Sequence, residues 1–293
     1  MDEFQAILKA RQFVRNAGIT AVPVELERLA AEANAKIKFV HDLSDDESGQ
    51  TTQHKGKHII IVNGNHREER QRFTVLHEIA HIILELPSQH HGPKLTTGDL
   101  LCYGRRPQEE ILCDVFAAEC LLPYELFSKD VSDVDISLEA VKALADRYKA
   151  SLTATGSRYA INAPEPCAFV LIEDGHIRYV SRSKFLNELK GWIDFNIPVP
   201  KGSVAHRLIQ GTSKSEDYDE LPTDVWFNGA IKNRPFLAEE AILLPEWSQC
   251  LSLIWFDESM KPVFERRSED DDDEPLLKEL DGTLPWPSKS RRR

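Results

Sequence analysis

Residues 68–86 of the chain read EERQRFTVLHEIAHIILEL and contain one HExxH motif, from His77 to His81. Apolar residues recur in this stretch at steps of three and four, which is the period of one buried stripe on an α-helix. Two histidines four positions apart on a helix lie one turn above the other, so both imidazoles can bind one ion. Glu78 lies about 100° around the helix from His77, where a base can take a proton from a water molecule beside that ion. The stretch predicts a helix that carries part of a metal centre.

The motif alone is short, and a chain with ten histidines can contain it by chance. The plain alternative is a helix with two surface or core histidines. Here the motif lies in mid-helix, with apolar neighbours on both sides and three charged residues at 68–70 that open the helix. This context favours a metal site over the alternative.

A catalytic zinc ion needs a third protein ligand, and residues 108–123 predict a helix that can supply it. Glu110 and Asp114 lie four apart on one face of this helix. We assign Glu110 to the metal and Asp114 to the outer N–H of a ligating histidine, because carboxylates commonly accept that proton. Glu109, about 100° away on the helix, is the alternative ligand. A solvated helix face explains Glu109 and Glu119 better than it explains the pair.

Together the two helices resemble a known family, the ImmA/IrrE metallopeptidases. The resemblance rests on HEIAH at 77–81 and on the pattern ExxxDxFAAxxLLP at 110–123, and it extends over roughly residues 5–185. Cys113, Cys120 and Leu122 differ from the residues usual in the family, and we expect all three at packing positions. The resemblance implies a zincin-like endopeptidase whose cofactor is Zn²⁺; a carboxylate ligand also suits Mn²⁺.

By the same resemblance, the substrate is a helix-turn-helix transcriptional repressor, cut so that genes of a mobile element or a stress response are derepressed. In zincins an edge strand beside the metal helix pairs with an extended peptide, and the resemblance points to the stretch around Gly49–Thr52 for this role, with Gly49 and Gln50 as candidate contacts. An ordinary solvent-edged strand explains this stretch equally well. Tyr103, His90 or His91, in the loop between the two helices, can polarise a substrate carbonyl, although such loop residues are more often simply exposed or packed.

The overall composition argues against direct nucleic-acid binding and for a reducing compartment. The 293 residues include 36 basic and 48 acidic side chains, a net charge of −12, and an acidic surface repels phosphate backbones. The five cysteines are scattered and odd in number, which argues against a disulfide framework. The chain has no apolar run of membrane-spanning length and opens with Met-Asp-Glu, unlike a signal peptide. We therefore expect a cytoplasmic protein that does not bind DNA directly.

We predict the α+β fold class, with four segments along the chain. Two helices (3–17, 23–35) and two strands (37–40, 59–62), separated by a turn-rich excursion or hairpin (42–56), precede the HExxH helix. The predicted segments are a mainly helical metallopeptidase core with a small sheet (1–130), a helical hairpin (131–165), an α+β sensor domain of GAF-like type (166–265) and an acidic, disordered tail (266–293).

The helical hairpin is predicted from two N-caps, Ser137 and Ser151, which open helices at 138–148 and 152–161. It resembles a helix-turn-helix, but Arg158 is the one long cationic side chain that the second helix offers to DNA. We therefore favour a packing role for this hairpin.

In the third segment, Asp174-Gly175 between two apolar runs predicts a β-hairpin. Further elements are expected as strands at 168–172, 177–181, 225–227, 240–244 and 250–256 and as helices at 184–192 and 204–210.

An alternative of a different class stays open at this point. A non-catalytic, ligand-sensing regulator that sequesters a repressor or a toxin, with the metal in a structural role, fits the same motifs.

Overall fold

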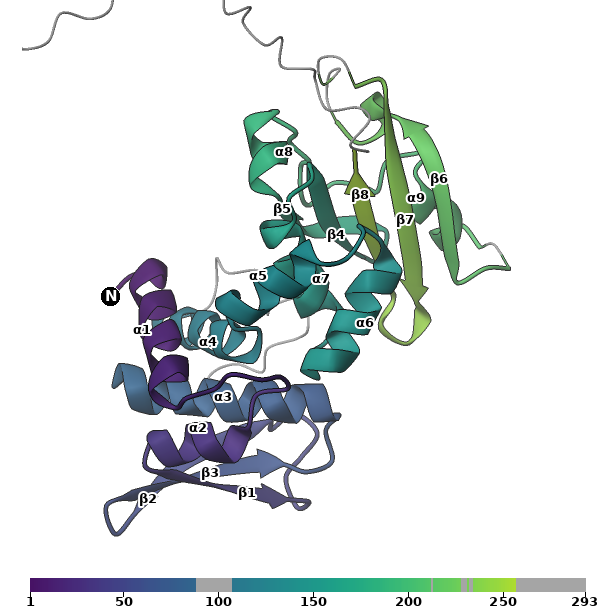
Figure 1. The fold of residues 1–293 in the computed structure, drawn as a ribbon. Coiled ribbons are helices and arrows are strands. Elements are labelled where there is room, and N and C mark those ends of the chain that lie inside the picture. The colour runs from purple at the N-terminus through teal and green to yellow at the C-terminus, as the bar shows by residue number, and fades with distance from the viewer. Residues whose placement is uncertain (88–106, 212, 228–230, 232–233, 257–293) are drawn as a thin grey trace, which may run out of the picture. The chain divides into compact units, whose positions relative to one another are not determined.

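The computed structural model describes residues 1–87, 107–211, 213–227, 231 and 234–256 (Figure 1). All of these residues belong to one compact unit. Among them, no helix is both long enough and apolar enough to cross a membrane. The predicted acidic tail lies outside the described residues.

The first 87 residues fold as helices around a small sheet. Their elements are α1 (Glu3–Asn16), α2 (Leu26–Glu32), β1 (Ala35–Val40), β2 (Gly49–His54), β3 (Lys57–Asn63) and α3 (Glu68–Leu84). Central strand β3 pairs in parallel with β1 and antiparallel with β2, so β2 is an edge strand. Lys55 and Gly56, with φ angles of 49° and 76°, form the two-residue turn of the β2–β3 hairpin. The expected helices, strands and hairpin are all present, and the HExxH motif lies on α3.

Four helices follow (Figure 1); the first of them packs against α1 and α3, and the last packs against the two before it. They are α4 (Gln108–Leu121), α5 (Tyr124–Ser132), α6 (Leu138–Tyr148) and α7 (Leu152–Asn162). The predicted N-caps of α6 and α7 are confirmed, because the hydroxyls of Ser137 and Ser151 accept hydrogen bonds from the backbone N–H three residues on. Helix α5 was not among the expected elements.

The rest of the described chain forms a five-stranded antiparallel sheet. Its elements are β4 (Cys167–Glu173), β5 (His176–Arg182), β6 (Glu216–Pro222), β7 (Phe236–Leu244) and β8 (Gln249–Trp255), with helices α8 (Lys184–Glu188) and α9 (Val204–Ile209). The strand order is β5-β4-β8-β7-β6. Asp174 and Gly175, with φ angles of 49° and 71°, form the predicted hairpin turn.

Three expectations in this sheet were wrong or incomplete. Residues 225–227 are not a strand: Thr223–Val225 is a short 3₁₀ turn, and the apolar character there reflects the burial of Trp226 and Phe227. The helix expected at 184–192 ends at Glu188. Strand β6 was missed because four of its seven residues, EDYDELP, are acidic, so its sequence lacks the alternation of apolar residues that predicts a strand.

One hydrophobic core joins the helices to the inner face of this sheet. The sheet contributes Phe169, Leu171 and Leu253 to the core that also contains the buried residues of α1, α3 and α4. A second core, around Trp226 and Ile254, lies between the other face and helices α8 and α9. The described chain is α+β with two sheets, as predicted, while the segment boundaries and the GAF-like type of the second sheet stay predictions.

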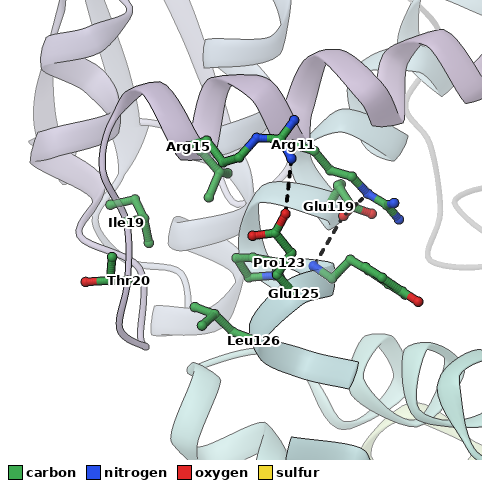
Figure 2. A pocket seen from close by; sticks show the side chains of 10 residues that line it. Arg11, Arg15, Ile19, Thr20, Glu119, Pro123, Glu125 and Leu126 are labelled. Atoms are coloured by element: carbon green, nitrogen blue, oxygen red, sulfur yellow. Dashed lines mark hydrogen bonds and ion pairs between the residues drawn. The ribbon is translucent and has the colours of Figure 1, made fainter. Parts of the chain in front are cut away.

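A buried carboxylate anchors the C-terminal end of α4. The side chain of Glu119 is 1% exposed. It accepts hydrogen bonds from Arg11 Nε on α1 at 2.9 Å, from Arg158 Nη2 on α7, and from the backbone N–H of Tyr124 at 3.2 Å. Figure 2 shows Glu119 and Arg11 beside a small cavity of about 160 Å³, whose wall also holds the exposed Glu125. Glu119 thus ties α4 to two helices that are distant in sequence.

We predict that Glu119→Gln lowers the free energy of unfolding by about 3–5 kcal/mol, because it leaves two guanidinium groups without their buried counter-charge. Urea unfolding followed by circular dichroism measures this loss. Glu125→Gln is the matched control: this carboxylate, 64% exposed, pairs with Arg15 on the same surface and is worth less than about 1 kcal/mol. Equal losses in the two variants would contradict the anchoring role.

Candidate metal centre

The HExxH helix α3 is buried between the first sheet and α4. Leu76, Ile79 and Ala80 are fully buried in the shared core, as the apolar stripe in the sequence predicts. This packing turns the opposite side of the helix, with His77 and His81, toward α4. Helix α3 ends when Glu85 adopts a left-handed conformation, and the backbone N–H of Leu86 turns back to the carbonyl of His81 at 3.1 Å.

Two imidazoles from α3 and one carboxylate from α4 meet at a single point. His77 Nε2 lies 3.1 Å from His81 Nε2 and 3.2 Å from Glu110 Oε2. His81 Nε2 lies 3.6 Å from Glu110 Oε1. Among the described residues, His77, His81 and Glu110 form a group whose ligand atoms all lie within 4.8 Å of one another. Glu109, the alternative ligand, is one residue away from this group and is not part of it.

The outer nitrogens of both rings are held by other groups. Asp114 Oδ1 lies 2.9 Å from His77 Nδ1, and the carbonyl oxygen of Leu86 lies 3.3 Å from His81 Nδ1. Because these oxygens are acceptors, each Nδ1 carries the proton and each Nε2 is directed at the common point. Asp114 on α4 therefore lies against the outer nitrogen of His77.

The donor group fits a divalent cation. Ligand atoms about 2.0–2.1 Å from one tetrahedral zinc ion lie about 3.3 Å apart, close to the separations of 3.1, 3.2 and 3.6 Å found here. Two imidazoles and a carboxylate are also a known donor set for catalytic zinc. Without a cation, two Nε2 atoms at 3.1 Å can share at most one proton. The arrangement is therefore better suited to a cation than to the histidines alone.

The electrostatics of the two histidines differ. Burial lowers the pKa of His77, but its hydrogen bonds to Asp114 and Glu110 outweigh burial and raise the pKa to about 10. Burial and the neighbouring charge of His77 lower the pKa of His81. In the metal-free protein His77 is thus protonated on both ring nitrogens, and a cation that binds there replaces the proton on Nε2.

Glu78 lies beside the donor group and faces strand β2. Its side chain is buried, at 4% exposed, and Oε2 accepts a hydrogen bond of 2.8 Å from the Thr51 hydroxyl. Gly49 lies on the same face of β2, so close to α3 that an added Cβ would be 2.6 Å from the Thr74 methyl. Gln50 points to the opposite face, because side chains alternate along a strand.

Thr51 lies inside the stretch 49–52 to which the resemblance points, but the sequence analysis assigned this residue no role of its own. Because side chains alternate along a strand, Thr51 lies on the same face of β2 as Gly49, and this spacing was the signal that could have identified it. Tyr103, His90 and His91 lie outside the described residues. The roles assigned to Gly49, Gln50 and the five residues on α3 and α4, Glu78 included, stay predictions. The structure does bring His77, His81, Glu110 and Asp114 together.

Comparison with known proteins identifies the segment that carries this site. Residues 24–159 match the IrrE N-terminal-like domain. The radiation response metalloprotease IrrE of Deinococcus deserti is 33% identical over 112 residues, which is 36% of each chain. The IrrE protein of Deinococcus radiodurans, with the same description, is 32% identical over 114 residues, 37% of this chain and 32% of that one. These alignments span about a third of each relative's length.

A solved structure shares the fold over a longer range. It is a Mycobacterium tuberculosis transcriptional regulator, which aligns with 86% of this chain and 76% of its own at a TM-score of 0.53 and 13% sequence identity. At that identity the likeness concerns the fold alone. The sequence matches are more specific, because the HExxH helix and the ExxxD helix both fall inside the matched segment. Residues 24–159, which carry both motifs, are therefore similar to the IrrE metalloproteases.

Proposed function

We propose that the protein is a metal-dependent endopeptidase. The observation that carries this proposal is the convergence of His77, His81 and Glu110 within 4.8 Å, with the buried carboxylate of Glu78 beside them. Two ligands come from one helix and the third from another, and the fold fixes both helices. A carboxylate that does not belong to the ligand group stands next to it, which is the arrangement that hydrolysis of a peptide bond requires.

Zn²⁺ is the cation we propose, and Mn²⁺ also suits the carboxylate ligand. A divalent cation supplies Lewis acidity, which polarises a carbonyl group and makes water a stronger acid. Asp114 holds the proton of His77 on Nδ1 and so keeps Nε2 available as a donor. The carbonyl of Leu86 does the same for His81.

Glu78 is the general base in this proposal. It takes a proton from the water that attacks the peptide carbonyl, and it passes a proton to the leaving amine. Its burial keeps the carboxylate in a site of restricted solvent, where its position is set by the surrounding protein. Strand β2 is an exposed edge next to this residue, and we propose that an extended peptide pairs with its backbone around Gly49 and Gln50.

A helix-turn-helix transcriptional repressor is the substrate class we propose, cut to derepress genes of a mobile element or a stress response. Support comes from the relatives, which are described as radiation response metalloproteases. The second sheet, with its own apolar core, is proposed as a GAF-like sensor. The net charge of −12 opposes direct DNA binding. A cytoplasmic location is part of the proposal, because the cysteines that the structure describes are buried free thiols.

Glu110→Ala is expected to abolish stoichiometric zinc binding, because two imidazoles alone hold a catalytic zinc ion weakly. Elemental analysis after dialysis against a weak chelator measures the bound metal. Glu109→Ala, one residue away on the same helix, is the control and should keep one zinc ion per chain. Retention of full zinc content by Glu110→Ala would remove this residue from the ligand set.

Asp114→Asn is expected to weaken zinc binding about 10–100-fold, because the outer N–H of His77 loses its charged acceptor while the side-chain shape is kept. Competition titration with a chromophoric chelator gives the dissociation constants of the variant and of the wild type. An unchanged constant would show that Asp114 does not support the ligand.

Glu78→Gln is expected to keep the metal and to lower the rate of peptide cleavage by about 10²–10⁴-fold, because an amide cannot act as the base. The assay uses a purified helix-turn-helix repressor as candidate substrate and follows its fragments by mass spectrometry, with and without chelator. Cleavage by Glu78→Gln at the wild-type rate would exclude this residue as the base. Binding of the repressor by the wild type without any fragments would favour a sequestering regulator.

A further inference from the structure

We propose that Thr51 is a positioning residue that holds the Glu78 carboxylate in the orientation from which it acts as a base. This inference rests on the proposed peptidase function and deepens it. The direct observation is the hydrogen bond of 2.8 Å from Thr51 Oγ1 to Glu78 Oε2. Glu78 is buried, so this hydroxyl binds it where little water competes for the carboxylate.

The hydrogen bond is one of three contacts that join α3 to β2 and to Ser48, the residue before it. Arg70 Nη2 donates to Ser48 Oγ at 2.9 Å, an added Cβ on Gly49 would touch Thr74, and Thr51 donates to Glu78. Positions 70, 74 and 78 are successive turns on one face of α3. Four helical residues rise about 6 Å, and two strand residues rise about 7 Å. From Gly49 to Thr51 the strand therefore advances by nearly the same distance as the helix does from Thr74 to Glu78, so contacts form at both positions.

The backbone of β2 keeps Thr51 in place. Thr51 lies opposite Ile60 in the antiparallel ladder, and Gly49 lies opposite Val62. Ile60 and Val62 are fully buried in the core. Gly49 lets the strand approach the helix: an added Cβ would also be 2.6 Å from the Ile61 carbonyl oxygen. The hydroxyl thus reaches Glu78 from a strand whose register is set by the core.

A carboxylate has two oxygens, and a base needs one of them directed at its proton donor. With Oε2 held by Thr51, rotation of the carboxylate is restricted and Oε1 is the oxygen left to receive a proton from water. The hydroxyl also makes a charge-assisted hydrogen bond, which is stronger than one between neutral groups. Loss of this restraint costs rate, because misplacement of a reacting group by about 1 Å can cost about 100-fold.

The test compares Thr51→Val, which keeps the shape and removes the hydroxyl, with Thr51→Ser, which keeps the hydroxyl. We expect Thr51→Val to lower kcat about 10–100-fold on the repressor substrate, with KM within about threefold of wild type and one zinc ion bound. Thr51→Ser should retain kcat within about threefold. Thr51→Ala replaces Thr51→Val if the valine variant does not fold. A wild-type kcat in a folded, zinc-loaded variant without the hydroxyl overturns the proposal.

A second measurement does not depend on a substrate. Crystal structures of the zinc-loaded variants should show one Glu78 rotamer in Thr51→Ser and more than one in Thr51→Val. Thr52→Val, on the opposite face of the same strand, is the structural control and should leave a single rotamer. If Glu78 keeps its wild-type rotamer in Thr51→Val, Thr51 does not position it. If rotamers change as expected but the wild type cleaves no repressor, the proposed peptidase function fails and the restraint on Glu78 stands.

Discussion

The metal centre depends on one constraint: the polar groups between α3 and α4 are largely buried, so they must satisfy one another. His77 meets this requirement through Asp114 on one nitrogen and Glu110 on the other. His81 meets it through the carbonyl of Leu86, which is available because α3 ends at Leu84 and the chain turns back there. Every hydrogen bond that orients an imidazole also leaves its Nε2 directed at the common point. The hydrogen bonds that satisfy the buried polar groups between α3 and α4 therefore also orient the donor atoms of the metal site.

The position of α4 is fixed from its other end. Glu119 lies nine residues after Glu110 and joins Arg11 of α1 to Arg158 of α7. A helix that is held at one end by a buried ion pair and along its length by Phe116 and Ala117 in the core has little freedom to shift its first turn. A displacement of Glu110 by about 1 Å would exceed the tolerance of a metal site. Glu119 at one end of α4 thus helps to hold Glu110 in place at the other end.

Local patterns in the sequence predicted most of the first sheet, the helices of the site and the hairpin caps. The period of α3, the four-residue spacing of Glu110 and Asp114, and the Asp174-Gly175 turn each depend on neighbours along the chain. The features that were missed depend on contacts between distant segments. Thr51 acquires its partner only when β2 lies against α3, 27 residues later. The acidic strand β6 is stabilised by pairing with β7, not by an apolar face of its own.

The second sheet is physically continuous with the metal-bearing helices. Gly156 of α7 lies so close to Phe169 of β4 that any side chain at position 156 would collide with the aromatic ring. Two residues further along α7, Arg158 binds Glu119 of α4. Strand β4, α7 and α4 therefore form a chain of close contacts that leads to Glu110. Such a path transmits a signal only if one of its elements can adopt two conformations. The close packing of Gly156 on Phe169 disfavours a shift of α7 relative to β4. In the arrangement described, β4 packs against α7, and α7 in turn holds α4 through Arg158 and Glu119.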